Sequence, residues 1–120
     1  MLTTIVRRIA QVLIVGGLCL TVADGARAQT QPLYSEWGVI TMISAGWSQD
    51  TMAVYHSPPA LVNPSKCTVL NGGYATDPGD TGRGLFHSVA LKAFMNKSQV
   101  QFVVLGCAFN KPKIIGVNVR

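Results

Sequence analysis

The fold is decided by residues 85–102, which read LFHSVALKAFMNKSQVQF. Apolar residues recur there at spacings of three and four, which predicts a helix over Gly84–Met95 with one apolar face. That face comprises Leu85, Phe86, Val89, Ala90, Ala93 and Phe94. Asn96 can adopt the left-handed conformation that ends a helix. A strand over 100–104 follows, because apolar residues alternate there with Gln101.

Three strands are expected before this helix and one more after the strand that follows it. Apolar and β-branched residues over 37–43 indicate a strand buried on both faces, and alternation over 51–56 indicates its hairpin partner. The segment 67–70 reads as a short third strand, because turn-forming residues bound it. The last strand is expected at Ile114–Val119, beyond a loop at Gly106–Pro112.

This order of three strands, one helix and two strands is that of an OB-fold, a five-stranded Greek-key barrel. The fold class is therefore expected to be mainly β with one helix. An open α+β sheet with one helix is the alternative, because barrel closure depends on strand bending that composition does not reveal.

The N-terminal segment has the layout of an export signal. Arg7 and Arg8 precede the apolar stretch 9–23, and Ala26-Arg27-Ala28 is a small-x-small cleavage site. A retained membrane anchor is the alternative, but about 15 apolar residues fall short of the roughly 20 that span a bilayer. The mature protein is therefore expected to be secreted or periplasmic, with no membrane contact after cleavage.

Length and composition limit the organisation of the remaining chain. The 120 residues allow one domain, and an apolar fraction of 48% excludes intrinsic disorder. We expect a signal peptide over 1–28, a flexible lead-in over 29–34 and a single domain over 35–120. The net charge is +5, but the basic residues form no run, so nucleic acid is not an expected partner.

Two cysteines, Cys67 and Cys107, remain after signal cleavage. In an oxidising compartment an even pair predicts a disulfide, which would close a loop of about 40 residues and contribute roughly 4 kcal/mol. A catalytic thiol assisted by His56 or His87 is the alternative, but neither cysteine lies in a recognisable nucleophile motif.

Enzymatic chemistry has little support in the sequence. The two histidines form no His-x-x-x-His metal pair, and nothing places two carboxylates across a cleft. Asp77 and Asp80 lie in a turn that lacks the downstream glutamate of a calcium loop. We therefore expect a protein that is not an enzyme and that holds no metal or cofactor.

Three stretches resemble the B subunits of the subtilase cytotoxin type and a wider group of small exported bacterial proteins. They are Val39–Gly46, Thr51–His56 and Leu85–Phe102. The resemblance implies an OB-fold, a ring-shaped homo-oligomer, binding of sialylated glycans and a separate catalytic subunit. The chain departs from those subunits at Val103-Val104, where they are rich in aromatic residues, and it lacks their cysteine in the second strand.

The ligand face of an OB-fold is bordered by the loop between strands one and two and the loop between strands four and five. An aromatic side chain flanked by amide and charged groups suits a sugar. The candidate ligand-binding residues in these loops are Trp47, Gln49, Asp50, Phe109, Asn110 and Lys111. The alternative is that Trp47 and Phe109 belong to the core.

The expected function is an exported, disulfide-stabilised binding module that recognises glycans as toxin B subunits do. The alternative is a structural or protein-interaction protein of the bacterial envelope that has no carbohydrate ligand and binds through an exposed strand edge.

Overall fold

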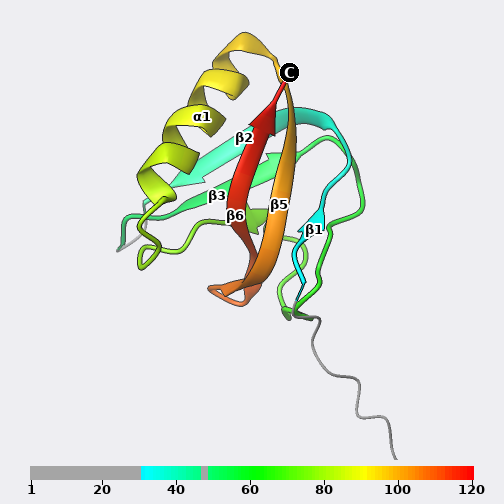
Figure 1. Ribbon diagram of the computed structural model, residues 1–120, viewed down its shortest axis with the longest axis vertical. Coiled ribbons are helices and arrows are strands. Elements are labelled where there is room, and N and C mark those ends of the chain that lie inside the picture. Colours follow the sequence, from blue (N-terminus) through cyan, green and yellow to red (C-terminus); the bar gives the residue numbers. More distant parts are fainter. Residues whose placement is uncertain (1–30, 47–48) are drawn as a thin grey trace, which may run out of the picture.

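The computed structural model describes residues 31–46 and 49–120, and strands predominate in this part of the chain. Its elements are β1 (Leu33–Tyr34), β2 (Gly38–Ala45), β3 (Met52–His56), β4 (Tyr74–Ala75), α1 (Arg83–Asn96), β5 (Gln99–Ala108) and β6 (Lys111–Val119). Figure 1 shows α1 along one side of the sheet, with the long strands β5 and β6 next to each other. The expected mainly β fold with one helix is confirmed.

The strands form a mixed sheet. β5 pairs antiparallel with β1, β2 and β6, and β2 pairs with β3, which pairs with β4. β4 runs parallel to β6, with Ala75 opposite Lys113. Because β6 also pairs with β5, the pairings from β5 through β2, β3, β4 and β6 return to the strand where they began.

The core lies between these strands and the inner face of α1. Val100, Phe102 and Val104 alternate along β5 and are fully buried, which confirms the inward face expected for this strand. The buried cluster consists of Ile40, Met52, Val54, Tyr74, Ala90, Ala93, Val100, Phe102, Val104 and Ile114.

The hairpin of β5 and β6 is longer than the sequence predicts. The loop expected at 106–112 is a two-residue turn, and strand pairing extends to Ala108 opposite Lys111. Phe109 and Asn110 have φ values of 51° and 59°, the positive φ that a type I′ turn requires at both central residues. Gly106, with φ of 79°, lies where the strand register shifts. This irregularity interrupts the alternating pattern, so the sequence does not predict that β5 continues beyond it.

Helix α1 exceeds its predicted range by one residue at each end, but its buried face differs from the prediction. Ala90 and Ala93 are buried, and Phe86 and Phe94 pack on the core. Leu85 was expected on that face, yet its side chain is 69% exposed. Helix α1 carries apolar residues on more than one of its faces, so their spacing does not identify the face that packs on the core. Lys97, rather than Asn96, takes the left-handed conformation at the C-terminal end.

The third strand is at Tyr74–Ala75, not at the predicted 67–70. Cys67 is instead held in an irregular segment, because its amide and carbonyl groups both bond the Asn63 side chain. Gly73 leads into β4 with φ of 72°, and a Cβ there would lie 2.5 Å from the Val54 carbonyl oxygen. The chain can therefore approach β3 closely only with glycine at this position.

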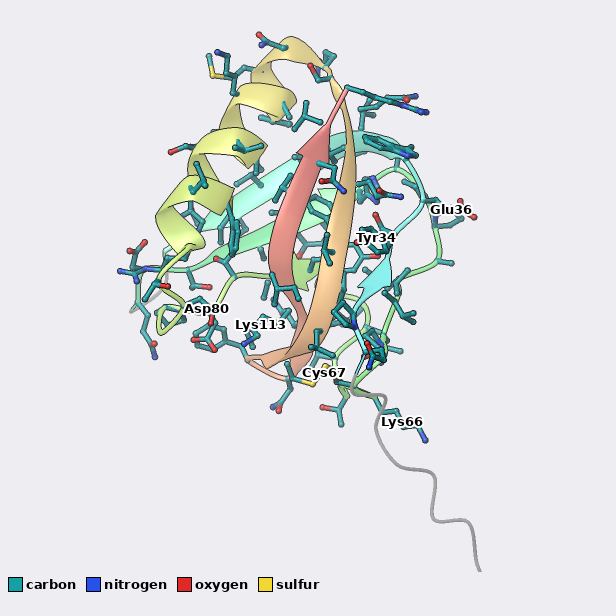
Figure 2. All side chains as sticks on the ribbon, in the orientation of Figure 1. Tyr34, Glu36, Lys66, Cys67, Asp80 and Lys113 are labelled. Carbon is teal, nitrogen blue, oxygen red and sulfur yellow. A yellow bond between two sulfur atoms is a disulfide. The ribbon has the colours of Figure 1, made fainter. Side chains whose placement is uncertain are left out.

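The disulfide between Cys67 and Cys107 is confirmed. Their Cα atoms lie 5.7 Å apart, and 40 positions separate the two residues in sequence. Figure 2 shows the bond at the end of the molecule where the β5–β6 hairpin turns. It joins the irregular segment before β4 to the end of β5. The β5–β6 turn is therefore linked covalently to a segment that precedes α1 in the sequence.

The start of the domain corrects one expectation. Leu33 and Tyr34 fall in the predicted lead-in 29–34, but they form β1 and pair with Val104 and Val103 of β5. The expected signal peptide over 1–28 lies outside the described residues. Among the helices of the described residues, none has the length and apolar character needed to cross a membrane.

His56 is a titratable group that lies against the core. Its ring centroid is 5.1 Å from that of Phe102, and its Nε2 atom is 3.2 Å from the Val100 carbonyl oxygen. Burial lowers the pKa of His56 below its ordinary value, although the Val100 carbonyl and the charge of Glu36 oppose this effect. The folded state therefore favours the neutral imidazole.

We expect His56 to make folding stability fall in acid. Its contribution is complete above the unfolded-state pKa of about 6.5 and is lost as the pH drops toward the lowered folded-state pKa, because the unfolded chain then binds the proton more readily. Urea unfolding of the parent and of His56→Gln from about pH 8 to about pH 5 tests this. The free energy of unfolding of His56→Gln should fall less steeply toward low pH than that of the parent. The same pH dependence in both proteins would contradict the expectation.

Candidate functional site

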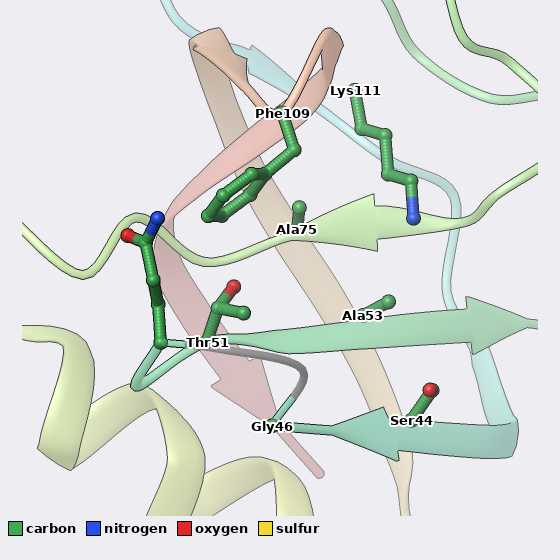
Figure 3. A pocket seen from close by; sticks show the side chains of 8 residues that line it. Ser44, Gly46, Thr51, Ala53, Ala75, Phe109 and Lys111 are labelled. Atoms are coloured by element: carbon green, nitrogen blue, oxygen red, sulfur yellow. The ribbon is translucent and has the colours of Figure 1, made fainter.

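A pocket of about 290 Å³ lies on the outer face of β2, β3 and β4. Its floor is formed by Ser44, Ala53 and Ala75, which are neighbours across the three strands in register. Figure 3 shows these side chains on the same side of the sheet, below Phe109 and Lys111.

Strand alternation explains why this face is hollow. Met52 and Val54 point into the core, so Ala53 between them points outward. Because the floor carries only methyl and hydroxymethyl groups, no long side chain rises from the floor itself. The described lining residues are Ser44, Gly46, Gln49, Thr51, Ala53, Ala75, Phe109 and Lys111.

Phe109 forms one wall of the pocket from the β5–β6 turn. The residue is 48% exposed, which contradicts the alternative that it belongs to the core. A partly exposed aromatic residue can offer a ring face to a ligand without unpacking the domain.

Lys111 supplies the positive charge of the pocket. In residues 31–46 and 49–120, its ammonium group has no carboxylate within ion-pair distance. Its aliphatic stem crosses Gly72, where a Cβ would lie 2.5 Å from Cε. Gly72 therefore makes room for the lysine to extend along the sheet.

The structure brings together three of the six residues expected to bind a ligand: Gln49, Phe109 and Lys111 line the pocket. Asn110 does not line it, and its carbonyl oxygen accepts a hydrogen bond from the Val69 amide at 2.8 Å. Trp47 lies outside the described residues.

Asp50 is the clearest exception among the expected ligand-binding residues. Its Oδ2 atom accepts a hydrogen bond from Nε of Arg83 at 2.7 Å, and its Oδ1 atom lies 3.7 Å from Nδ1 of His87. It faces α1 instead of the pocket, because the chain turns between Gln49 and Thr51, both of which line the cavity.

Sequence reasoning missed the floor of the pocket. Ser44, Ala53 and Ala75 carry no distinctive chemistry, and their importance follows from the register of three strands. The alternation of Met52 and Val54 placed Ala53 on the outward side of 51–56, but Tyr55 lies on that side too, so the pattern held no sign of a depression there. The third strand was placed at 67–70, so Ala75 could not be aligned with them.

His87 joins a group that superficially resembles a hydrolase relay. Its Nε2 atom is 2.7 Å from Oγ1 of Thr76, and Asp50 faces the other ring nitrogen. Thr76 is only 1% exposed, however, and its Oγ1 atom accepts a hydrogen bond from the Met52 amide at 2.9 Å. A hydroxyl held in this way has no access to a substrate, so the group is structural.

The acidic turn is likewise occupied by the protein's own cation. Lys113 Nζ lies 3.7 Å from Asp77 Oδ2 and 3.5 Å from Asp80 Oδ1, and Figure 2 shows Lys113 beside Asp80. Within the described ranges, no group of three or more histidine, cysteine, aspartate or glutamate side chains could hold a metal ion.

Comparison with protein-family models, curated proteins and solved structures finds no match to this chain. The geometry of the pocket is therefore the basis on which a function can be proposed.

Proposed function

We propose that the chain is an exported, disulfide-stabilised binding module with an OB-fold, and that it is not an enzyme. Its ligand is a glycan, which binds in the pocket above Ala53 and Ala75. The observation that carries this proposal is a half-exposed aromatic residue, Phe109, over a floor of small side chains, with amide, hydroxyl and ammonium groups around it.

The strand pairings support an OB-fold. If β2 to β6 are counted as its five strands, the first pairs with the second and fourth, the third runs parallel to the fifth, and α1 connects the third to the fourth. Loop 46–51 then joins strands one and two, and the Phe109-Asn110 turn joins strands four and five. These are the two connections that border the ligand face of OB-folds that bind oligosaccharides.

The lining chemistry favours a saccharide. The apolar face of a sugar ring can lie on Phe109, while Gln49, Ser44 and Lys111 offer hydrogen bonds to its oxygens. About 290 Å³ is near the lower end of ligand pockets, at roughly 300 Å³, so the pocket suits the end of a glycan rather than a long chain.

The backbone at Phe109 gives further support. A positive φ is uncommon for a bulky residue and costs about 1–3 kcal/mol, whereas glycine or asparagine would satisfy the turn. An aromatic residue at a strained position is therefore more readily explained by a role in binding than by the needs of the hairpin.

Two features favour export. The disulfide between Cys67 and Cys107 suits an oxidising compartment, and the sequence of residues 1–28 has the three parts of a signal peptide. We therefore propose that the mature protein is secreted or periplasmic.

A glycan array probed with the mature protein tests the proposal. Phe109→Ala should lower the affinity for the retained saccharide about tenfold, because it removes the stacking surface. Tyr34→Ala is the matched control, since Tyr34 is an exposed aromatic residue that does not line the pocket. The control should bind like the parent. A folded parent that retains no saccharide would refute the proposal.

A structural or protein-interaction role in the envelope is the second candidate. Leu85 and Met95 are exposed on α1, which favours contact with another protein or another copy of the chain. Light scattering at micromolar concentration distinguishes a homo-oligomer from a monomer. Capture of one envelope protein together with a silent glycan array would support this candidate over saccharide binding.

A further inference from the structure

The segment Gln49–Thr51 alternates between the pocket and the helix. Gln49 and Thr51 line the cavity, whereas Asp50 between them is held by Arg83 of α1 at 2.7 Å. The direction in which Gln49 enters the pocket therefore depends on the anchoring of its neighbour.

Backbone hydrogen bonds close this segment at Thr51. The Thr51 amide donates to the Gln49 carbonyl oxygen at 2.9 Å, and its own carbonyl oxygen accepts from the Gly46 amide at 3.0 Å. Gly46, Gln49 and Thr51 form the rim of the pocket, and Thr51 bonds the other two. Because Thr51 directly follows Asp50, a displacement of Asp50 would weaken both hydrogen bonds.

His87 connects the same rim to the pocket floor. Its Nδ1 atom faces Asp50, and its Nε2 atom is 2.7 Å from Oγ1 of Thr76, the residue after Ala75. The Thr76 carbonyl oxygen accepts a hydrogen bond from Oγ1 of Thr51 at 2.7 Å. The His87 side chain of α1 therefore contacts both Asp50, beside the rim, and Thr76, which directly follows the floor residue Ala75.

The exposure of Asp50 limits this group to a local effect. Its side chain is 62% exposed, and ion pairs of this kind contribute little to global stability. Their loss should be visible in the rim rather than in the unfolding of the whole domain.

We propose that Arg83 and His87 are positioning residues of the pocket. Through Asp50 they hold Gln49 and Thr51 in the orientation that a glycan meets, so α1 contributes to ligand affinity without touching the ligand. This inference rests on the proposed function only for the nature of the ligand, because the ordering of the rim can be measured in the free protein.

Amide hydrogen exchange of the free protein tests the positioning directly. In Arg83→Ala, the Gly46 and Thr51 amides should exchange about fivefold faster, while the Phe102 amide in β5 should be unchanged. Arg83→Lys keeps the charge but lacks the Nε donor that bonds Asp50, so its rim exchange should lie between that of the parent and that of Arg83→Ala. Lys92→Ala, an exposed substitution elsewhere on α1, is the matched control.

Array binding gives the second measurement. Arg83→Ala should weaken binding of the retained saccharide about threefold to fivefold, with an unchanged urea midpoint. Parental rim exchange in both Arg83→Ala and Asp50→Asn would overturn the positioning role. If Arg83→Ala shows faster rim exchange than the parent while the parent retains no saccharide, the positioning is supported and the proposed glycan ligand is refuted, so the two failures are distinguishable.

Discussion

Replacing Cys67 and Cys107 with serine is expected to lower the free energy of unfolding by about 4 kcal/mol, because the bond closes a loop of 40 positions and restricts the unfolded chain. Urea unfolding of the double variant and the parent measures this difference. For a domain with a stability of about 5–15 kcal/mol, such a loss removes a large share of the total.

The reduced parent is the matched control for this double variant. Treatment with a dithiol should lower its urea midpoint to near that of the serine variant, since both lack the cross-link. Weaker binding should accompany the loss, because the disulfide anchors the segment whose Val69 amide bonds the Asn110 carbonyl oxygen in the Phe109 turn. Equal stabilities of the oxidised parent and the serine variant would contradict the prediction.

Filling the pocket is expected to abolish most binding without harming the fold. Ala53→Leu projects extra carbons from the floor into a cavity of about 290 Å³. Overlap with a bound saccharide should cost about 1–3 kcal/mol, which corresponds to about a fivefold to 150-fold loss of affinity. Titration calorimetry with the saccharide identified on the array measures the loss.

Ala45→Leu is the matched control for this substitution. Ala45 is exposed near the end of β2 and does not line the pocket. It should bind the saccharide like the parent, and both leucine variants should unfold at similar urea concentrations. Parental affinity in Ala53→Leu would place the ligand somewhere other than this cavity.

The sequence predicted those parts of the fold that have strong local signals. The alternation in Val100, Phe102 and Val104 marks β5, and spacings of three and four mark α1, because each element buries one face. The pairing of Cys67 with Cys107 was also predictable, since two cysteines allow only one internal bond.

The failures came from features that tertiary structure decides. β4 has only two residues, and its place depends on Gly73 approaching the Val54 carbonyl, which no local pattern reveals. Leu85 was placed in the core because α1 is apolar on more than one side. Asp50 was assigned to the ligand site because its anchors, Arg83 and His87, lie far away in sequence.

The pocket was predictable in location but not in composition. The loops expected to border a ligand face contain Gln49, Phe109 and Lys111, which all line it. Its floor required the register of β2, β3 and β4, which pairs Ser44 with Ala53 and Ala53 with Ala75. The short β4 was expected at 67–70, so the register that places Ala75 beside Ala53 could not be inferred from the sequence pattern.

The most direct test of saccharide binding in this pocket is an NMR titration of the isotope-labelled mature protein with the glycan retained on the array. The proposal predicts that the amide signals of Ala53, Ala75 and Lys111 shift together with one dissociation constant, while those along the exposed side of α1 stay in place. Shifts confined to α1, or none at saturating glycan, would contradict it.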